Sequence, residues 1–327
     1  MTDLLNEPIA KNITPVARLN IPGGGQITVQ DGLAFVGHMD APNGTTIIDI
    51  KNPSKPKVLK QIFLEDELSH THKVRVAGKI MITNVEQAQR HLLRKGEQLP
   101  NVIRTLTASL NRQPDDSEIA DALGLPPSKL ADVRQFLKKG YQDGGFRVWD
   151  ISDPKNPELL SYVRTYGFGV HRFDMDENYA YISTEMNGYI GNILVIYDLA
   201  DPKRPIEISR WHMPGQHLNA GEKPSWKGYK NRLHHALRVG NELWAAVWNA
   251  GFQVIDISDI CNPTTIAGHN YHPPFPEPTH TVLPCEQLID GRRIAVVVDE
   301  EHDHTPGQLH AFLWIFDVTD LNTIPAL

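Results

Sequence analysis

The chain has 327 residues, which is enough for about two domains or for one large repetitive domain. Hydrophobic residues make up 40% of it and charged residues 22%, a composition that excludes disordered and collagen-like classes. With 32 Lys and Arg against 39 Asp and Glu, the net charge of -7 provides no basic surface for nucleic acid or an anionic membrane.

Cysteine content and the first residues bear on the compartment. Cys261 and Cys285 are the two cysteines of the sequence, too few for a disulfide framework. The start, residues 1–14, has neither a basic nor an apolar leader region, and no apolar run approaches the roughly 18 residues of a membrane span. We therefore expect a cytoplasmic protein with a small-molecule substrate, no nucleic-acid or membrane partner, and an open question of homo-oligomerisation.

One motif occurs five times along the chain. Each copy is a short apolar strand, an Asp and a Pro-containing turn, and the copies are residues 44–56, 145–157, 192–205, 251–263 and 312–325. From the second copy onward they are about 50 to 60 residues apart, which is the length of a four-stranded propeller blade. The pattern predicts an all-β fold: a five-bladed β-propeller forming a single domain over residues 1–327. The last repeat lacks a fourth strand, so we expect residues 14–22 to close it.

The motifs also carry a family resemblance. The sequences GFRVWDISDPKNP (145–157) and GFQVIDISDICNP (251–263), with RLHH (232–235) and PTHT (278–281), resemble the LVIVD-repeat β-propeller proteins. That family is distantly similar to selenium-binding proteins. The resemblance covers nearly the whole chain outside one insertion and implies the propeller fold. Selenium-binding propellers are linked to metal-dependent oxidation, so by analogy it also implies metal chemistry.

Histidines recur at the start of the first strand of four repeats. Alignment of these strands places His72, His171, His235 and His280 in one column, with Gly25 in the first repeat. The innermost strands of a propeller face its axis, so four imidazoles are predicted to converge on one metal ion. Imidazole suits Fe, Cu, Zn or Ni. We expect one divalent metal, with Fe(II) favoured, Cu second, and Zn or Mn possible; the alternative is four separate histidines of the core or of turns.

A second column holds polar residues. Glu86 and Glu185 each follow a column histidine by fourteen residues, the same step from His235 reaches Asn249, and Glu300 ends the second strand of the last repeat. We expect these cofactor-binding partners to accept the second ring N–H of the ligand imidazoles; the alternative is that they are solvated strand ends. Four histidines with three carboxylates resemble carotenoid-cleaving oxygenases, which implies non-haem iron, although those proteins have seven blades.

We expect the long loops to lie at the end of the propeller where the column histidines converge. Residues 212–233 and 269–278 carry Trp226, Tyr229, Tyr271 and Phe275, which we predict to form an aromatic wall, with loop-on-loop packing as the alternative. Further imidazoles lie near this end and are candidates for acid–base groups, alternative ligands or a polar rim: His70, His234, His302 and His304. Strand alternation predicts that His235, and not His234, points inward. The candidate catalytic residues are His234, His304 and Tyr229.

An insertion of residues 88–143 in the second blade has a helical pattern. Leu130, Val133, Phe136 and Leu137 are spaced for one apolar face. We predict a lid whose apolar face packs on the loops around Trp226 and Tyr229. Local positive charge in HLLRK and RQFLKK leaves a nucleic-acid module as the alternative.

Together these patterns predict a mononuclear metal-dependent oxidoreductase or dioxygenase that acts on a small apolar or aromatic compound. Two alternatives stay open. One is a lyase or hydrolase that uses a redox-inactive ion, and the other is a metal-stabilised interaction propeller without turnover.

Overall fold

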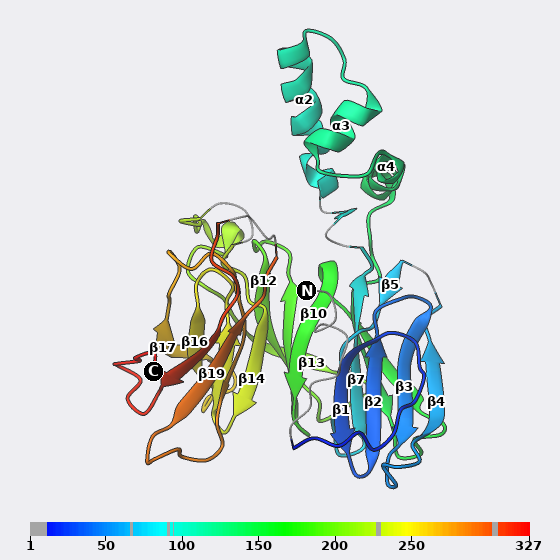
Figure 1. Cartoon of the computed structure of the whole chain (residues 1–327), viewed down its shortest axis with the longest axis vertical. Helices are drawn as coiled ribbons and strands as arrows, with labels where there is room; N and C mark the ends of the chain where they lie inside the picture. The colour runs from blue at the N-terminus through cyan, green and yellow to red at the C-terminus, as the bar shows by residue number, and fades with distance from the viewer. Residues whose placement is uncertain (1–11, 66–67, 90–91, 94, 227–229, 303–306) are drawn as a thin grey trace, which may run out of the picture.

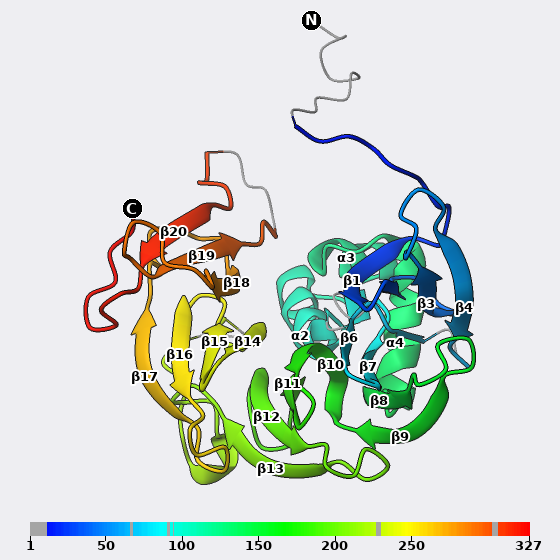
Figure 2. The same cartoon turned by 90° about the horizontal axis from the view of Figure 1, so that it is seen from below.

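The computed structural model describes residues 12–65, 68–89, 92–93, 95–226, 230–302 and 307–327. The chain is mostly antiparallel β-structure, and its sheets follow one another around a common axis (Figures 1 and 2). None of the helices in these ranges is long and apolar enough to cross a membrane.

Hydrogen bonding defines four sheets. The first contains β1 (Gly24–Gln30), β2 (Leu33–His38), β3 (Asn43–Asp49) and β4 (Lys57–Phe63). The second has nine strands: β5 (Ser69–His70), β6 (Val74–Ala77), β7 (Ile80–Gln87), β8 (Gly145–Asp150), β9 (Glu158–Arg164), β10 (Tyr166–Met175), β11 (Tyr179–Glu185), β12 (Asn192–Asp198) and β13 (Ile206–Trp211). The third contains β14 (His235–Val239), β15 (Glu242–Ala246), β16 (Phe252–Asp256) and β17 (Thr264–His269), and the fourth β18 (Thr279–Pro284), β19 (Ile294–Asp299) and β20 (Leu313–Asp317).

The nine-stranded sheet contains two of the repeats. Its two halves are joined where Gly169 of β10 pairs with Glu86 of β7. The structure therefore shows a propeller-like arrangement of antiparallel sheets, while the count of five separate blades stays a proposal.

The repeated Asp has the same structural role in all five motifs. Its carboxylate accepts the backbone N–H two residues further on, at 2.7 to 3.0 Å, which begins the turn to the outermost strand. The five residues are Asp49, Asp150, Asp198, Asp256 and Asp317. The recurring Asp and the Pro-containing turns are thus explained by turn chemistry alone.

The predicted closure by the N-terminal segment is not seen in residues 12–23. The edge of β20 is occupied instead by the end of the chain, because Phe316 bridges to Ala326 and Ile324 packs into the core of the last sheet. Leu19 and Ile21 pack on the first sheet, against Val36 and its neighbours. The apolar residues of the N-terminal segment are therefore already in contact with their own repeat.

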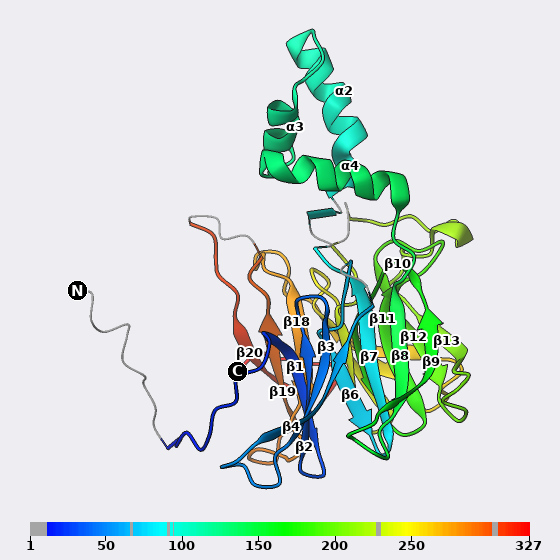
Figure 3. The same cartoon turned by 90° about the vertical axis from the view of Figure 1, so that its right-hand side faces the viewer.

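The insertion is helical and lies beyond one end of the sheets (Figures 1 and 3). It comprises η1 (Lys95–Gln98), α2 (Leu99–Leu110), α3 (Asp116–Ala122), η2 (Pro127–Lys129) and α4 (Leu130–Lys139). Asp115 begins α3 with a reciprocal cap: its carboxylate accepts the Glu118 N–H, and the Glu118 carboxylate accepts the N–H of Asp115. A further short helix, η3 (Leu218–Ala220), lies in the loop after β13.

The apolar face of α4 packs differently from the prediction. Leu130 and Val133 are buried against α2 and α3 in a core of the insertion's own, and Leu137 is exposed. Phe136 alone of the four predicted residues stacks on the sheets, with its ring 5.7 Å from that of Phe168 in β10. The three helices bury their apolar side chains against one another, so the apolar face of α4 is not available to the loop around Trp226. Tyr229 lies outside the described residues.

Candidate metal centre

Strand register identifies which histidines are equivalent. In each repeat the motif Asp pairs with the first residue of the second strand, as Asp150 pairs with Ile80 and Asp256 with Glu242. The residue three positions after this first residue pairs with the innermost strand of the same repeat. Its partners in the five repeats are Ile27, Val74, Phe173, Ala236 and Val282. On the innermost strand, the residue two positions before each of these partners is Gly25, His72, His171, His234 or His280.

The column therefore contains His234, and the prediction of His235 is wrong by one residue. The Nε2 of His235 lies 3.3 Å from the Phe173 carbonyl oxygen, and its buried Nδ1 has no hydrogen-bond partner. Lys73 and Arg172 occupy the position that is equivalent to His235 in two other repeats. His235 is thus directed toward the neighbouring strand β10 and not toward the other column histidines.

Glu86 lies close to three histidines, His70, His72 and His171, which form a cluster around its carboxylate. Its carboxylate lies 3.0 Å from the Nε2 of His70, 3.2 Å from the Nδ1 of His171 and 3.8 Å from the Nε2 of His72. The side chain is almost completely buried, with 1% of the residue exposed. A buried carboxylate is costly unless it is paired, so the ring N–H groups of His70 and His171 stabilise it.

Two imidazoles from consecutive repeats face each other. The Nε2 atoms of His171 and His234 are 2.9 Å apart. The Nδ1 of His234 donates to the His280 carbonyl oxygen at 2.6 Å, and the Nδ1 of His171 donates to Glu86. Burial lowers the pKa of His234 well below its ordinary value, so this ring is neutral. The 2.9 Å contact is within hydrogen-bond distance, so either a second proton on one of the two rings or a metal ion bound by both Nε2 atoms offsets the repulsion between their lone pairs.

The donor set fits a metal ion on these grounds. Two nitrogen ligands at right angles on an ion with bonds of about 2.1 Å are roughly 3.0 Å apart, close to the separation of the His171 and His234 nitrogens. The donor atoms of His70, His72 and Glu86 all lie within 4.8 Å of one another, as do those of His234, His280 and Glu300. His171 lies between these two groups through its contacts with Glu86 and His234.

Arg172 and Glu300 bring charge to the second group. The Nε2 of His280 accepts from the Arg172 guanidinium at 2.9 Å, and its Nδ1 contacts the Thr281 hydroxyl. Burial and the Arg172 charge lower the pKa of His280 to about 4. Burial raises the pKa of Glu300, but the hydrogen bond from His302 and nearby positive charges outweigh it and bring this pKa to about 2. At neutral pH His280 is therefore neutral and Glu300 ionised.

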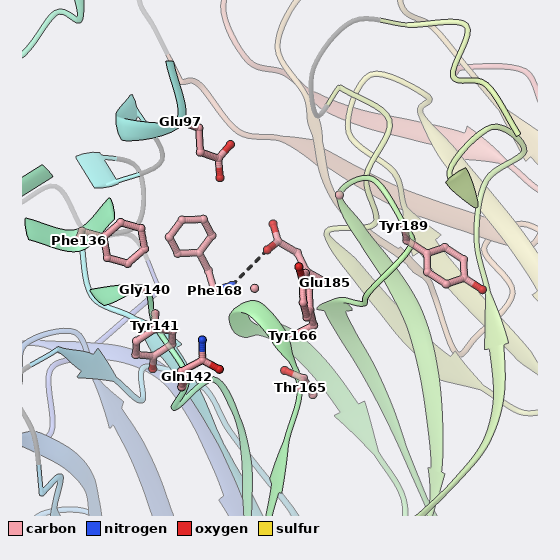
Figure 4. Close-up of a pocket in the computed structure, with 12 residues that line it drawn as sticks. Glu97, Phe136, Gly140, Tyr141, Gln142, Thr165, Tyr166, Phe168, Glu185 and Tyr189 are labelled. Carbon is pink, nitrogen blue, oxygen red and sulfur yellow. Dashed lines mark hydrogen bonds between the residues drawn. The ribbon is translucent and has the colours of Figure 1, made fainter. Parts of the chain in front are cut away.

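Of the four predicted polar partners, Glu86 and Glu300 lie in the cluster. Glu300 is 4.0 Å from the Nε2 of His234 and 3.1 Å from that of His302. Glu185 is not the partner of His171, since both ring nitrogens of His171 contact Glu86 and His234; it accepts the Phe168 N–H in a separate cavity (Figure 4). The side chain of Asn249 donates to the Pro276 carbonyl oxygen and does not reach His235. Glu86, Glu185 and Glu300 each lie six residues after the first residue of their second strand, whereas Asn249 lies one residue beyond the equivalent position.

The structure places some of the predicted catalytic residues and some residues of the predicted aromatic wall, and others lie outside the described residues. His234 is one of the column histidines, whereas His304 and Tyr229 lie outside the described residues. Tyr271 and Phe275 pack against Trp314 of β20, so these two rings cover the last sheet, which differs both from the predicted aromatic wall and from packing of loop on loop. Tyr271 also donates from its hydroxyl group to Asp299 at 2.5 Å.

Sequence reasoning gave too little weight to His70 and missed Lys73 and Arg172. His70 is two residues before His72, and strand alternation places such residues on one face. Lys73 and Arg172 directly follow column histidines, a recurrence that was visible in the sequence. A cavity of about 660 Å³ is lined by these residues together with Glu86, Glu300, His72 and His171. The centre is therefore open to a small molecule and carries both positive and negative side chains.

Comparisons with known proteins agree with this repeat architecture. The family described as LVIVD repeat matches residues 25–63, 140–165, 174–212 and 239–268. These segments contain most of β1, all of β2 to β4, β8, β9, β11 to β13, β15 and β16, and most of β17. The chain is thus similar to the LVIVD repeat over these four segments.

Solved β-propeller structures are similar to the chain in fold. A putative 6-phosphogluconolactonase from Bacteroides uniformis has a TM-score of 0.53 at 8% identity, over 90% of this chain and 67% of that one. A luciferin-regenerating enzyme has a TM-score of 0.48 at 8% identity, over 90% and 78%. The computationally designed Ika8 protein has a TM-score of 0.48 at 9% identity over 92% of this chain, which spans only 61% of the Ika8 chain. No curated protein matches the sequence.

Proposed function

We propose that this protein is a mononuclear metal-dependent oxidoreductase, a five-bladed propeller that holds one divalent ion on its axis. The ligands are His72, His171, His234 and His280, one from each of four repeats. The observation that carries the proposal is the pair of Nε2 atoms of His171 and His234, which face each other at 2.9 Å while both Nδ1 atoms donate elsewhere.

Imidazole ligands suit Fe, Cu, Zn or Ni, and we propose Fe(II) first, with Cu second and Zn or Mn as further candidates. Such an ion, when bound, supplies redox chemistry or activation of a bound oxygen. The first repeat contributes Gly25 to the column, and a Cβ atom there would overlap the backbone carbonyl of His72. This repeat therefore leaves its side of the ion without a protein ligand, and we assign that side to the substrate.

The chain's own side chains prepare the site. Glu86 holds the tautomer of His171, and the His280 carbonyl holds that of His234. The 660 Å³ cavity beside the column accommodates a small molecule, and we propose a small apolar or aromatic compound. The helical insertion begins at the rim of this cavity, where Ala88 and Gln89 line it, and we propose that it acts as a lid.

Lys73 and Arg172 favour a second candidate function. Both line the cavity, and Arg172 reaches His280 at 2.9 Å. Two positive side chains near a metal ion stabilise negative charge on a substrate oxygen. This supports a lyase or hydrolase that uses a redox-inactive ion.

Metal analysis of the purified protein, together with spin-resonance spectra before and after anaerobic reduction, tests the proposal. We expect one ion per chain and a spectrum that changes with oxidation state. One zinc ion per chain with no paramagnetic signal would support the lyase or hydrolase instead. Two ions per chain would contradict the mononuclear centre and match two separate groups around Glu86 and Glu300. Protein without metal, even after loading with Fe(II), Cu and Zn, would overturn the proposal.

A further inference from the structure

Consecutive repeats pack on each other through the same pair of positions. One is the residue two positions before the motif Asp, which is fully buried in the first four repeats: Ile47, Val148, Ile196 and Val254. The other is the residue two positions after the column residue, which is at most 1% exposed in the last four repeats: Val74, Phe173, Ala236 and Val282. Each residue of the first set shares a hydrophobic core with the residue of the second set from the next repeat. One kind of interface is therefore used four times along the chain.

The same two positions are exposed where the series of repeats begins and ends. Ile315, two residues before the motif Asp of the last repeat, is 43% exposed, and Leu313 on the same face of β20 is 64% exposed. Ile27, two residues after Gly25 in the first repeat, is 58% exposed. Figure 2 shows that the sheets form an open ring, with the first and the fourth sheet on either side of the opening. Each of these two sheets therefore presents one face without the neighbour that covers it elsewhere in the chain.

Both end faces are apolar across several strands. On the fourth sheet, Leu283 pairs with Val296 and Val296 pairs with Ile315, so the three side chains form one row. On the first sheet, Leu19 and Ile21 pack on Ala34 and Val36 but leave Ile27 and Val29 exposed. Contiguous apolar surface of this kind marks a contact site on a folded protein.

The internal interfaces argue for a partner from outside the chain. Their side chains are fully buried in a closely packed core, and closing the ring within one chain would deform all four of them. A second copy requires no deformation, because its first sheet carries the same kind of face that each following repeat presents within the chain.

We propose that two copies of the chain associate head to tail, with the fourth sheet of each packed on the first sheet of the other. A two-fold arrangement of this kind covers all four end faces. It needs no metal ion, so it is separate from the proposed function.

Light scattering of the full chain at micromolar concentration tests this, and we expect the mass of two chains. Ile315→Glu and Ile27→Glu each bury an unpaired carboxylate in the contact, so each should weaken association by roughly a hundredfold or more. Ile266→Glu is the matched control, because Ile266 is 49% exposed on β17 at the edge of the third sheet. This control should keep the mass of two chains.

A mixture of the two interface variants tests the head-to-tail arrangement. The Ile315→Glu chain keeps an intact first sheet and the Ile27→Glu chain an intact fourth sheet, so one contact of a mixed dimer is unchanged. The mixture should therefore associate more tightly than either variant alone, which packing of like faces would not produce.

Three results would each overturn the proposal. One is an unchanged two-chain mass in a folded Ile315→Glu or Ile27→Glu protein, and another is a mixture that associates no more tightly than its components. The third is a single-chain mass for the unmodified protein. In that case a loss of stability in Ile27→Glu would show that the two end faces of one chain meet each other, and unchanged stability would show that they stay in contact with solvent.

Discussion

Glu86 illustrates how a single buried side chain organises the site. Desolvation of a carboxylate costs several kcal/mol even after the protein relaxes, and the contacts with His70 and His171 offset this cost. The same contacts place the hydrogen of His171 on Nδ1, which leaves Nε2 to face His234. One carboxylate therefore determines which nitrogen is available to a metal ion.

Glu86→Gln is predicted to weaken metal binding by roughly ten- to a hundredfold, because a neutral amide holds the His171 tautomer less firmly. Competition with a chromogenic chelator measures the change. Glu185→Gln is the matched control, since Glu185 lies in the other cavity and should keep the affinity of the unmodified protein. Equal affinities in all three proteins would show that Glu86 does not orient a ligand.

The choice between His234 and His235 shows what the sequence could and could not decide. Both side chains are buried, so burial does not separate them. Counting back from the two-residue turn does: His72 precedes Ala77 by the same interval as His234 precedes Val239. Strand alternation identifies the inward-facing residue only when the register is fixed at the turn. A longer turn and a bulge at His171 hide the equivalence in the third repeat.

At the scale of elements, β10 joins the site to the fold. It carries His171, it pairs with β7 through Gly169 and Glu86, and its first residues line the cavity that contains Glu185. Gly169 has a φ of +92°, and a Cβ atom there would overlap the Val85 carbonyl oxygen. The two halves of the nine-stranded sheet can approach each other only because this residue has no side chain.

Gly169→Ala is accordingly predicted to lower the free energy of unfolding by roughly 2 to 5 kcal/mol, the sum of backbone strain and overpacking. Gly240→Ala tests strain alone, because Gly240 has a φ of +62° and no atom within 4 Å of its added Cβ. It should cost only about 1 kcal/mol. Chemical denaturation measures both, and similar losses would mean that the contact of β10 with β7 is not tight.

The insertion is an element that the propeller does not need for its own pairing. Val85 of β7 already pairs with Gly145 of β8, so a short loop can join these strands directly. Helix formation was predictable from periodicity. Its packing was not, because an apolar face does not reveal whether other helices or the sheets will cover it.

Replacement of residues 89–143 by a short Gly-containing loop should leave a folded protein that still binds metal. What should rise is the rate of metal removal by a chelator, by roughly tenfold, because a lid that excludes solvent also limits access to the centre. Ser69→Ala is a control that removes only the hydrogen bond to the Tyr141 hydroxyl, 2.7 Å long in the intact protein. Identical removal rates with and without the insertion would rule out a lid.

At the scale of the whole molecule, the repeats made the antiparallel, propeller-like fold predictable. The motif Asp and the turns that follow it recur in five copies and need no long-range information. The chain ends were less predictable, since residues 325–327 and not residues 14–22 lie along β20. Local turn signals do not say which of two free segments reaches an open edge.

Metal binding should stabilise the entire arrangement, because the proposed ligands come from four repeats. A ligand at a thousand times its dissociation constant contributes about 4 kcal/mol to stability. We therefore expect the melting temperature of the metal-free protein to rise by several degrees when metal is restored. The His234→Ala protein should show no such rise, and a rise of equal size in that variant would place the metal elsewhere.

The most direct test of the four-histidine centre compares His234→Ala with His235→Ala. Both changes remove a buried imidazole from adjacent positions, so they are matched in chemistry and in burial. Metal content per folded chain is measured after purification and reloading under the same conditions. The His234→Ala protein should lose most of its metal, and the His235→Ala protein should keep one ion per chain. Full metal content in His234→Ala, with loss in His235→Ala, would contradict the centre described above.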